Sequence, residues 1–134
     1  MAAPEPGPGG TLTDLAEAEC WTLLGTRPVG RLVWSGAAGL TVLPVNYVAV
    51  TGRILLRTAA YGSMARECRD SEVAFQVDDI DDETHSGWSV LVRGRCRDAE
   101  PGDEPDSDVW APGTRRVLFA IEAREVTGRR LAAG

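Results

Sequence analysis

The segment 55–65 carries the best candidate for an anion site in this sequence. A predicted strand ends at Arg57 and Thr58, and a loop containing Gly62 then places Ser63 at the start of a predicted short helix. Free backbone N–H groups and the positive end of the helix dipole favour an anion there, and an arginine can bind phosphate through two parallel hydrogen bonds. The segment therefore predicts a phosphate site. The alternative is that Arg57 is a surface residue and Ser63 only a helix cap.

Other sequence features indicate little catalytic chemistry. The sequence has no GxSxG, GxGxxG, Walker or HExxH motif. Its single histidine, His85, has no partner at ligand spacing, and the acidic run 78–83 lacks the pattern of a calcium loop, so no metal site is predicted. Arg93, Arg95 and Arg97 alternate along a predicted strand, where they either bind phosphate or form its exposed face. No side chain stands out as catalytic.

The N-terminal region predicts a single helix. Thr13 or Asp14 can cap it, and Glu17 follows Asp14 at capping-box spacing. Apolar residues then recur at helical spacing until Gly25. The expected helix covers 13–24.

Beyond residue 30 the apolar pattern alternates, which predicts mainly strands. Pro44 cannot donate to a strand ladder, so it predicts a sheet edge or a bulge where the strand bends. Along one later strand, Trp88, Val90, Val92 and Cys96 are expected to share a buried face. The expected elements are strands over 30–35, 40–50, 54–58, 73–78, 88–98 and 115–126, and a short helix over 64–69.

These elements predict a mainly β fold, namely a six-stranded antiparallel barrel with an N-terminal helix and a short inserted helix. Barrel closure removes unpaired sheet edges, and a sandwich is the alternative. The proline and glycine content of the start predicts a disordered tail over 1–12, which leaves 13–134 as a single domain. The last strand supplies more apolar surface than one small barrel needs, which predicts a homodimer. Its apolar residues are Val117, Phe119, Ile121 and Ala123.

The composition narrows the possible partners and compartment. The formal charge is −6, with 20 acidic residues against 14 basic ones, and every basic residue is arginine. This balance argues against nucleic-acid or anionic-membrane binding, and the absence of lysine excludes Schiff-base chemistry. The three cysteines have no metal-ligand spacing and read as reduced thiols. No apolar run is long enough to span a membrane, so we expect a cytoplasmic protein.

A series of short segments, taken in order, carries a family resemblance that no single segment carries. The segments are 19–24, 30–32, 44–47, 56–58, 62–63, 74–78, 87–94, Trp110 and 127–130. Their order and spacing resemble the pyridoxamine 5′-phosphate oxidase-like, FMN-binding split-barrel proteins, in particular the short members. The resemblance extends over residues 13–131.

The resemblance implies a flavin site at a homodimer interface. It implies phosphate or ribityl contacts for Arg57, Thr58 and Ser63. Met64 stands where many relatives carry a basic phosphate ligand, so the anion site is expected to be weaker or suited to another cofactor. The remaining contacts implied for the flavin ring are Pro44, Val45, Asn46, Tyr47, Trp88, Ser89, Trp110 and the partner subunit's Arg129. For Tyr47 and Trp88 the alternative is a role as half-buried core aromatics.

The function that this resemblance implies is an FMN-binding oxidoreductase that transfers hydride to or from an unidentified small molecule. Its electron donor would be a nicotinamide or another enzyme. The alternatives are a deazaflavin-dependent reductase and a non-enzymatic protein that binds a flavin, a haem or another small ligand. True pyridoxamine phosphate oxidase activity is not expected, because the substrate-phosphate arginines and histidine of that enzyme are not recognisable in this sequence.

Overall fold

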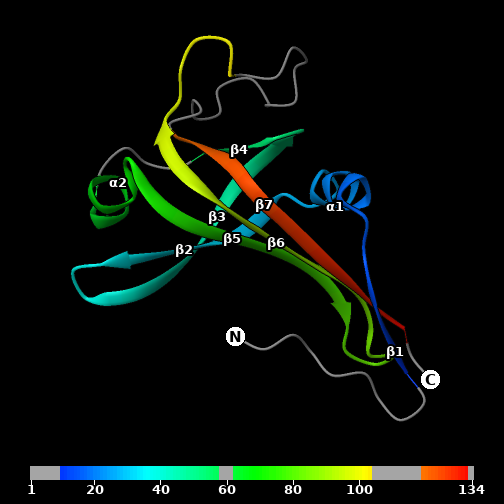
Figure 1. Cartoon of the computed structure of the whole chain (residues 1–134). Helices are drawn as coiled ribbons and strands as arrows, with labels where there is room; N and C mark the ends of the chain where they lie inside the picture. The colour runs from blue at the N-terminus through cyan, green and yellow to red at the C-terminus, as the bar shows by residue number, and fades with distance from the viewer. Residues whose placement is uncertain (1–9, 58–61, 104–118, 133–134) are drawn as a thin grey trace.

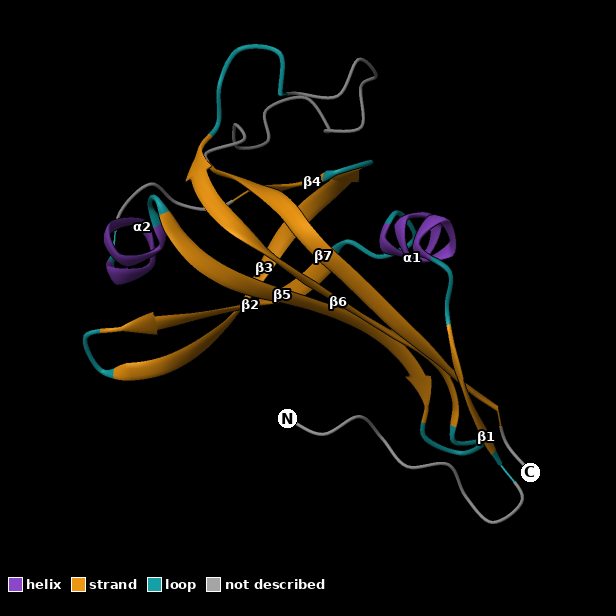
Figure 2. Cartoon of the chain, viewed as in Figure 1, coloured by secondary structure: helices purple, strands orange, loops and turns teal. Residues whose placement is uncertain are grey.

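The computed structural model describes residues 10–57, 62–103 and 119–132, and these form an antiparallel β structure with two short helices (Figure 1). Figure 2 shows that strands make up most of the described part of the chain. The elements in chain order are β1 (Thr11–Asp14), α1 (Glu17–Leu24), β2 (Val29–Gly36), β3 (Gly39–Val50), β4 (Arg53–Arg57), α2 (Ser63–Cys68), β5 (Ser71–Asp81), β6 (Ser86–Asp98) and β7 (Phe119–Ala132).

Six of these strands close into a ring. Hydrogen-bonded neighbours follow the order β7-β4-β3-β2-β5-β6, and β6 then pairs with β7. All the pairings are antiparallel. This arrangement confirms the predicted six-stranded split barrel over the sandwich. The seventh strand, β1, was not expected, and it lies outside the ring, paired with the end of β7.

The N-terminal helix is shorter than predicted and has a different start. Thr13 and Asp14 belong to β1, opposite Arg130 and Arg129, so the expected capping box does not form. Helix α1 begins at Glu17, and its N-cap, Ala16, makes no side-chain capping bond. Strand pairing with the distant end of β7 overrides the local capping signal at this point. Residues 11 and 12 also lie in β1, while residues 1–9 of the expected tail are outside the described residues.

Strands β2 and β3 form a hairpin that projects from the barrel (Figure 1). Its register is unbroken from Val29 opposite Asn46 to Gly36 opposite Gly39. Pro44 lies opposite Arg31, in the part of β3 that, among the described residues, pairs only with β2. Pro44 therefore lies at an unpaired sheet edge. This is the first of the two positions predicted for it, and the strand needs no bulge to accommodate the missing N–H donor.

Strands β5, β6 and β7 make a long ribbon whose two faces differ as predicted. Trp88, Val90, Val92 and Cys96 are buried on the inner side of β6. The acidic run 78–83 is divided between a strand and a turn, because residues 78–81 belong to β5. The carboxylate of Asp81 then accepts hydrogen bonds from the backbone N–H groups of the turn at 2.8 and 3.0 Å.

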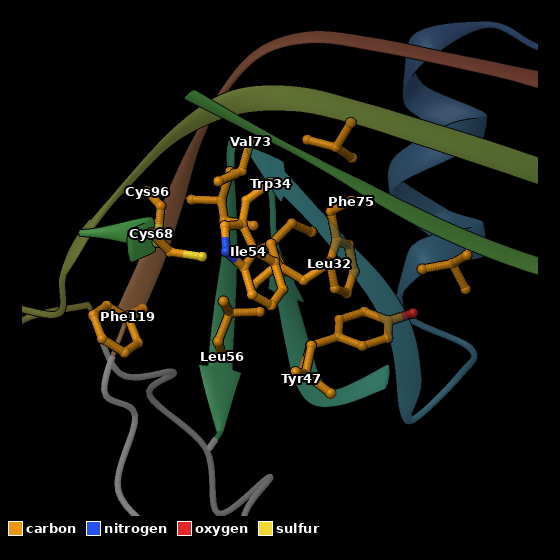
Figure 3. Close-up of a cluster of buried hydrophobic side chains, with 14 of the residues drawn as sticks. Leu32, Trp34, Tyr47, Ile54, Leu56, Cys68, Val73, Phe75, Cys96 and Phe119 are labelled. Atoms are coloured by element: carbon orange, nitrogen blue, oxygen red, sulfur yellow. The ribbon is translucent and has the colours of Figure 1, made fainter. Parts of the chain in front are cut away.

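The inner faces of the ring strands fill the barrel with packed apolar side chains (Figure 3). Phe75, Leu32 and Leu56 are fully buried there. Gly30 makes room for the ring of Phe75, because a Cβ on Gly30 would lie 2.3 Å from that ring. Both helices add to this core: Cys20 and Leu24 come from α1, and the remaining contributions, Met64, Ala65 and Cys68, come from α2.

Strand β7 uses its apolar face within this one chain. Phe119 and Ile121 are buried in the core and Ala123 packs against it, while Val117 lies outside the described residues. These side chains therefore give no reason to expect a dimer. A separate small cluster, built on Leu55 and Ala120, lies on the outer side of β4 and β7.

Candidate functional site

The predicted site residues divide between two opposite faces of the sheet. On β3, Val45 and Tyr47 point inward and are buried, whereas Pro44 and Asn46 are exposed on the outer face. Successive residues of a strand point to opposite sides, so these four neighbours cannot line one surface. Only Pro44 and Asn46 remain as side-chain contacts for an outer ligand.

Tyr47 is a core residue with a satisfied hydroxyl. Its O–H donates to the backbone carbonyl of Leu24 at 2.5 Å, and its ring meets Phe75 edge-on with centroids 5.0 Å apart. Burial raises the pKa of Tyr47 to about 12, so the phenol stays protonated. This placement favours the alternative role of Tyr47 as a core aromatic over a flavin contact through its side chain.

Trp88 and Met64 also lie in the core, 7% and 6% exposed. Trp88 lies on the inner face of β6, and Met64 lies on the buried side of α2. Neither side chain is presented to the outer surface. Five polar residues of the predicted flavin site have exposed or half-exposed side chains: Asn46, Arg57, Ser63, Ser89 and Arg129.

Four of these five fall on one row across the outer face of the sheet. Arg57 lies opposite Asn46, and Asn46 lies opposite Val29. The β2–β5 pairing, continued by two residues from Arg31 opposite Gln76, places Asp78 beside Val29. Asp78 lies opposite Ser89, and Ser89 lies opposite Arg129. Residues far apart in sequence therefore lie along one line of strand pairings across the sheet.

The middle of this row holds a polar network that the sequence analysis missed. Gln76 donates to Asp78 at 2.8 Å and to Ser89 at 3.1 Å. Arg31 donates to the side-chain oxygen of Gln76 at 3.4 Å and lies 3.7 Å from the Asp78 carboxylate. The signal available in sequence was only that Arg31, Gln76 and Asp78 alternate with buried residues. Their meeting depends on the β2–β5 register, which local spacing does not predict.

Beside the polar network, the outer face of the hairpin carries exposed apolar side chains on both sides of Arg31. Val29, Val42 and Leu40 are 46%, 55% and 83% exposed, and Pro44 is exposed between them. Val33 joins them from β2, opposite Val42. We call this set, Val29, Val33, Leu40, Val42 and Pro44, the hairpin face. Contiguous apolar surface of this kind marks an interaction or ligand surface.

At the other end of the row, Arg57 is half-buried on β4 and Ser63 is the exposed first residue of α2. Gly62, which precedes the helix, has a φ of 105°, a conformation that favours glycine. Helix α2 has only six residues, so its dipole contributes little by itself. Thr58 and Trp110 lie outside the described residues.

Two of the three alternating arginines of β6, Arg93 and Arg97, form ion pairs. Arg93 lies 3.0 Å from Glu125. Arg97 donates to both carboxylate oxygens of the buried Asp103, at 2.8 and 3.0 Å, and to Glu122 at 2.6 Å. The Arg97 hydrogen bonds lower the pKa of Asp103 to about 2. These ion pairs favour the interpretation of the β6 arginines as the exposed face of the strand over their interpretation as a phosphate site.

The other chemical groups give no further site within the described ranges. No set of three or more histidine, cysteine, aspartate or glutamate side chains there could hold a metal ion. The three cysteines are free and buried, and burial raises the pKa of Cys96 to about 12 and of Cys68 to about 11. Neither described helix is long and apolar enough to cross a membrane.

Comparison with known proteins supports the family resemblance. The family model described as pyridoxamine 5′-phosphate oxidase matches residues 16–130. The chain is 30% identical to the uncharacterized protein Rv0080 of Mycobacterium tuberculosis, over 91% of this chain and 87% of that one.

Solved structures agree with this match. The FAD binding protein of Mycobacterium smegmatis is 31% identical, with a TM-score of 0.72 over 90% of this chain and 98% of that one. The conserved protein DIP1874 of Corynebacterium diphtheriae is 28% identical, with a TM-score of 0.65 over 89% and 97%. From the barrel, the family match and these relatives together, this chain belongs to the pyridoxamine 5′-phosphate oxidase family.

Proposed function

We propose that this protein is a flavin-binding oxidoreductase that works as a homodimer in the cytoplasm and transfers hydride to or from a small molecule. The observation that carries the proposal is the row on the outer face, which aligns Arg57, Asn46, Ser89 and Arg129 beside the apolar hairpin face. Family membership adds support from a relative named as an FAD binding protein. The buried free cysteines are compatible with a reducing compartment.

The length of the row supports a site shared between two chains. Arg57 and Arg129 are five strands apart along the ring order β4-β3-β2-β5-β6-β7, or about 24 Å at about 4.8 Å per strand. The route through the β4–β7 pairing is also long, because Arg129 lies about 33 Å along β7 from Phe119, the partner of Leu56. One flavin ring beside Asn46 does not span either route. A second copy, packed against the hairpin face, brings its own Ser89 and Arg129 to that ring.

The hairpin face also gives a reason for dimerisation that β7 does not. Covering Val42, Leu40 and Val29 removes apolar surface from water, and a biological interface buries more than about 1,000 Å² in total. A dimer built there encloses the outer row, so the cofactor and the second copy would occupy adjoining parts of one surface.

The residues on this surface fit a flavin in their chemical types. A flavin, when bound, supplies the hydride chemistry itself. Arg57 would pair with its phosphate, and the amide of Asn46 would bind polar edge atoms of the ring. Pro44 and Val42 offer apolar contact that excludes water. We assign no residue of this chain a role as catalytic acid or base.

FMN is the cofactor predicted from the sequence, and two observations make FAD a second candidate. The 31% identical relative from M. smegmatis is named for FAD. Met64, where many relatives carry a basic phosphate ligand, is buried and supplies no cation for the doubly charged terminal phosphate of FMN. The diphosphate of FAD has no such terminal group. A deazaflavin is the third cofactor that the Met64 position allows.

The visible spectrum of the purified protein, followed by titration with FMN and FAD, tests this proposal. We expect flavin absorbance or quenching of flavin fluorescence on binding, together with a dimer mass in sedimentation. A sharp Soret band, a stable monomer at micromolar concentration, or no binding of either flavin would contradict it. Turnover of bound flavin by a nicotinamide then separates an enzyme from a carrier.

A further inference from the structure

A single carboxylate joins α2 to the β2–β3 hairpin. The Glu67 side chain on α2 accepts the backbone N–H of Ala37 at the hairpin tip. It also accepts the indole N–H of Trp34 at 3.3 Å. Trp34 is 4% exposed, so its N–H depends on this acceptor. Hydrogen bonds to an ionised acceptor are stronger than neutral ones, and these two lower the pKa of Glu67.

Gly36 provides an independent sign that the carboxylate is seated closely against the hairpin. A Cβ placed on Gly36 would lie 2.7 Å from both carboxylate oxygens of Glu67. Glycine at this position therefore leaves the space that the carboxylate occupies. Because the obstructing atoms are the end of a flexible side chain, a larger residue at position 36 would displace the carboxylate before it moved the backbone.

The two elements that Glu67 joins carry different parts of the outer surface. Helix α2 begins at Ser63, near the phosphate end of the proposed site. The hairpin carries Val42 and Pro44, the apolar part of that site. Within the described ranges, the hairpin tip pairs with no strand other than its own two arms, so contact with α2 sets its direction (Figure 1).

We infer that Glu67 is a positioning residue that holds the hairpin against α2 in the orientation in which the hairpin face meets the flavin and the second copy. This inference rests on the proposed function. Glu67 itself lies behind the hairpin face and touches neither partner. Its loss would allow the hairpin tip to swing, so that Val42 and Pro44 no longer share one surface with Asn46 and Arg57.

The test measures two properties of the full-length protein, namely amide hydrogen exchange of Ala37 without cofactor and affinity for FMN and FAD. In Glu67→Ala we expect exchange at Ala37 to quicken and flavin affinity to fall, each about tenfold, the scale of one charge-assisted hydrogen bond. Glu67→Gln keeps an oxygen acceptor for Ala37 and should recover part of both losses. Glu72→Ala, which removes an exposed carboxylate from β5, is the matched control and should change neither.

Gly36→Ala is a second way to remove the Glu67 carboxylate from the hairpin. It should reproduce the effects of Glu67→Ala, and the double variant should be no worse than either single one, because the methyl group then fills the space that the carboxylate left. Faster exchange at Ala37 with unchanged flavin affinity would overturn the positioning role while leaving the proposed function intact. Unchanged hydrogen exchange at Ala37 in Glu67→Ala would show that Glu67 does not hold the hairpin tip. Failure of the wild type to bind any flavin would overturn the proposed function and the positioning role built on it.

Discussion

The inner and outer faces of strands β3 and β4 are built from alternate residues of the same short segments, yet they have opposite properties. Inside, Tyr47 and Leu56 lie opposite each other, fully packed, and the one polar atom of the pair has its hydrogen bond to Leu24. Outside, Asn46 and Arg57 lie opposite each other beside exposed Pro44 and Val42.

This difference separates residues that hold the fold from residues that are available for binding. Substitutions on the inner face should lower the free energy of unfolding and leave the outer surface chemically unchanged. Substitutions on the outer face should lower affinity for the cofactor with little effect on unfolding. The experiments below separate effects on unfolding from effects on flavin binding.

The largest expected effect comes from the inner face. Phe75→Ala should lower the free energy of unfolding by about 3–5 kcal/mol, because it leaves a cavity beside Tyr47 and Gly30. Urea denaturation of the cofactor-free protein measures this change. Arg95→Ala, on the exposed face of β6 and away from the hairpin face, is the control and should cost under about 0.5 kcal/mol. Similar losses for both variants would contradict the core role of Phe75.

The next effect comes from the outer face. Arg57→Ala should weaken flavin binding by about 2–4 kcal/mol, the scale of a partly buried charged contact, with unfolding little changed. Arg57→Lys should recover only part of the loss, since a point charge cannot reproduce the planar fork of arginine. Fluorescence titration with FMN and FAD measures both.

Arg95→Ala is the matched charge control for Arg57→Ala, because it removes an exposed arginine from β6. Arg53 is unsuitable as a control, since its Nε lies 3.4 Å from the buried Asp103. Equal flavin affinity in the wild type and in Arg57→Ala would show that Arg57 is an ordinary surface residue.

The outer face also has a structural part, the Asp103 ion pairs, and this part has a pH signature. Asp103→Asn should lower the free energy of unfolding at neutral pH by about 1–3 kcal/mol, because Arg97 loses one of its two charged partners. The folded pKa of Asp103, about 2, is below the usual value of 3.8, so its stabilisation is complete above about pH 4 and is lost as the pH falls toward 2. Denaturation midpoints measured between pH 2 and 7 should therefore converge for the two proteins at low pH. A constant gap would contradict this account.

The smallest expected effect tests the core assignment of an aromatic residue that was expected at the flavin. Tyr47→Phe should lower the free energy of unfolding by about 1 kcal/mol, the net worth of its hydrogen bond to Leu24, and should leave flavin affinity unchanged. Thermal denaturation and flavin titration of the same preparation measure the two quantities. A loss of flavin affinity without a loss of stability would indicate that Tyr47 contacts the flavin.

Much of the fold was predictable because alternation and turn residues are local signals. The strands of the ring, the two faces of β6 and the edge position of Pro44 all follow from such patterns. The capping box at Asp14 failed because Arg129, far along the chain, pairs with that residue in the sheet. Strand β1 could not be predicted for the same reason, since it pairs with the end of β7, more than a hundred residues away in the sequence.

The candidate site was predictable in its residue types and less so in its geometry. Alternation along the strand already indicates that the side chains of Pro44 and Tyr47 point to opposite faces of the sheet. The network of Arg31, Gln76 and Asp78 depends on the register between β2 and β5, which is set by the packing of the core. No spacing within either strand carries that information.

Complementation between two inactive variants tests most directly the central claim that Arg57 and the partner's Arg129 serve one site. Arg57→Ala and Arg129→Ala chains, co-expressed with different tags, should each fail to bind flavin tightly as homodimers. Random assembly makes about half of the dimers mixed, and each mixed dimer has one intact site, so about a quarter of all sites should regain wild-type affinity. Tight binding at no site in the purified mixed dimers would contradict a site shared between chains.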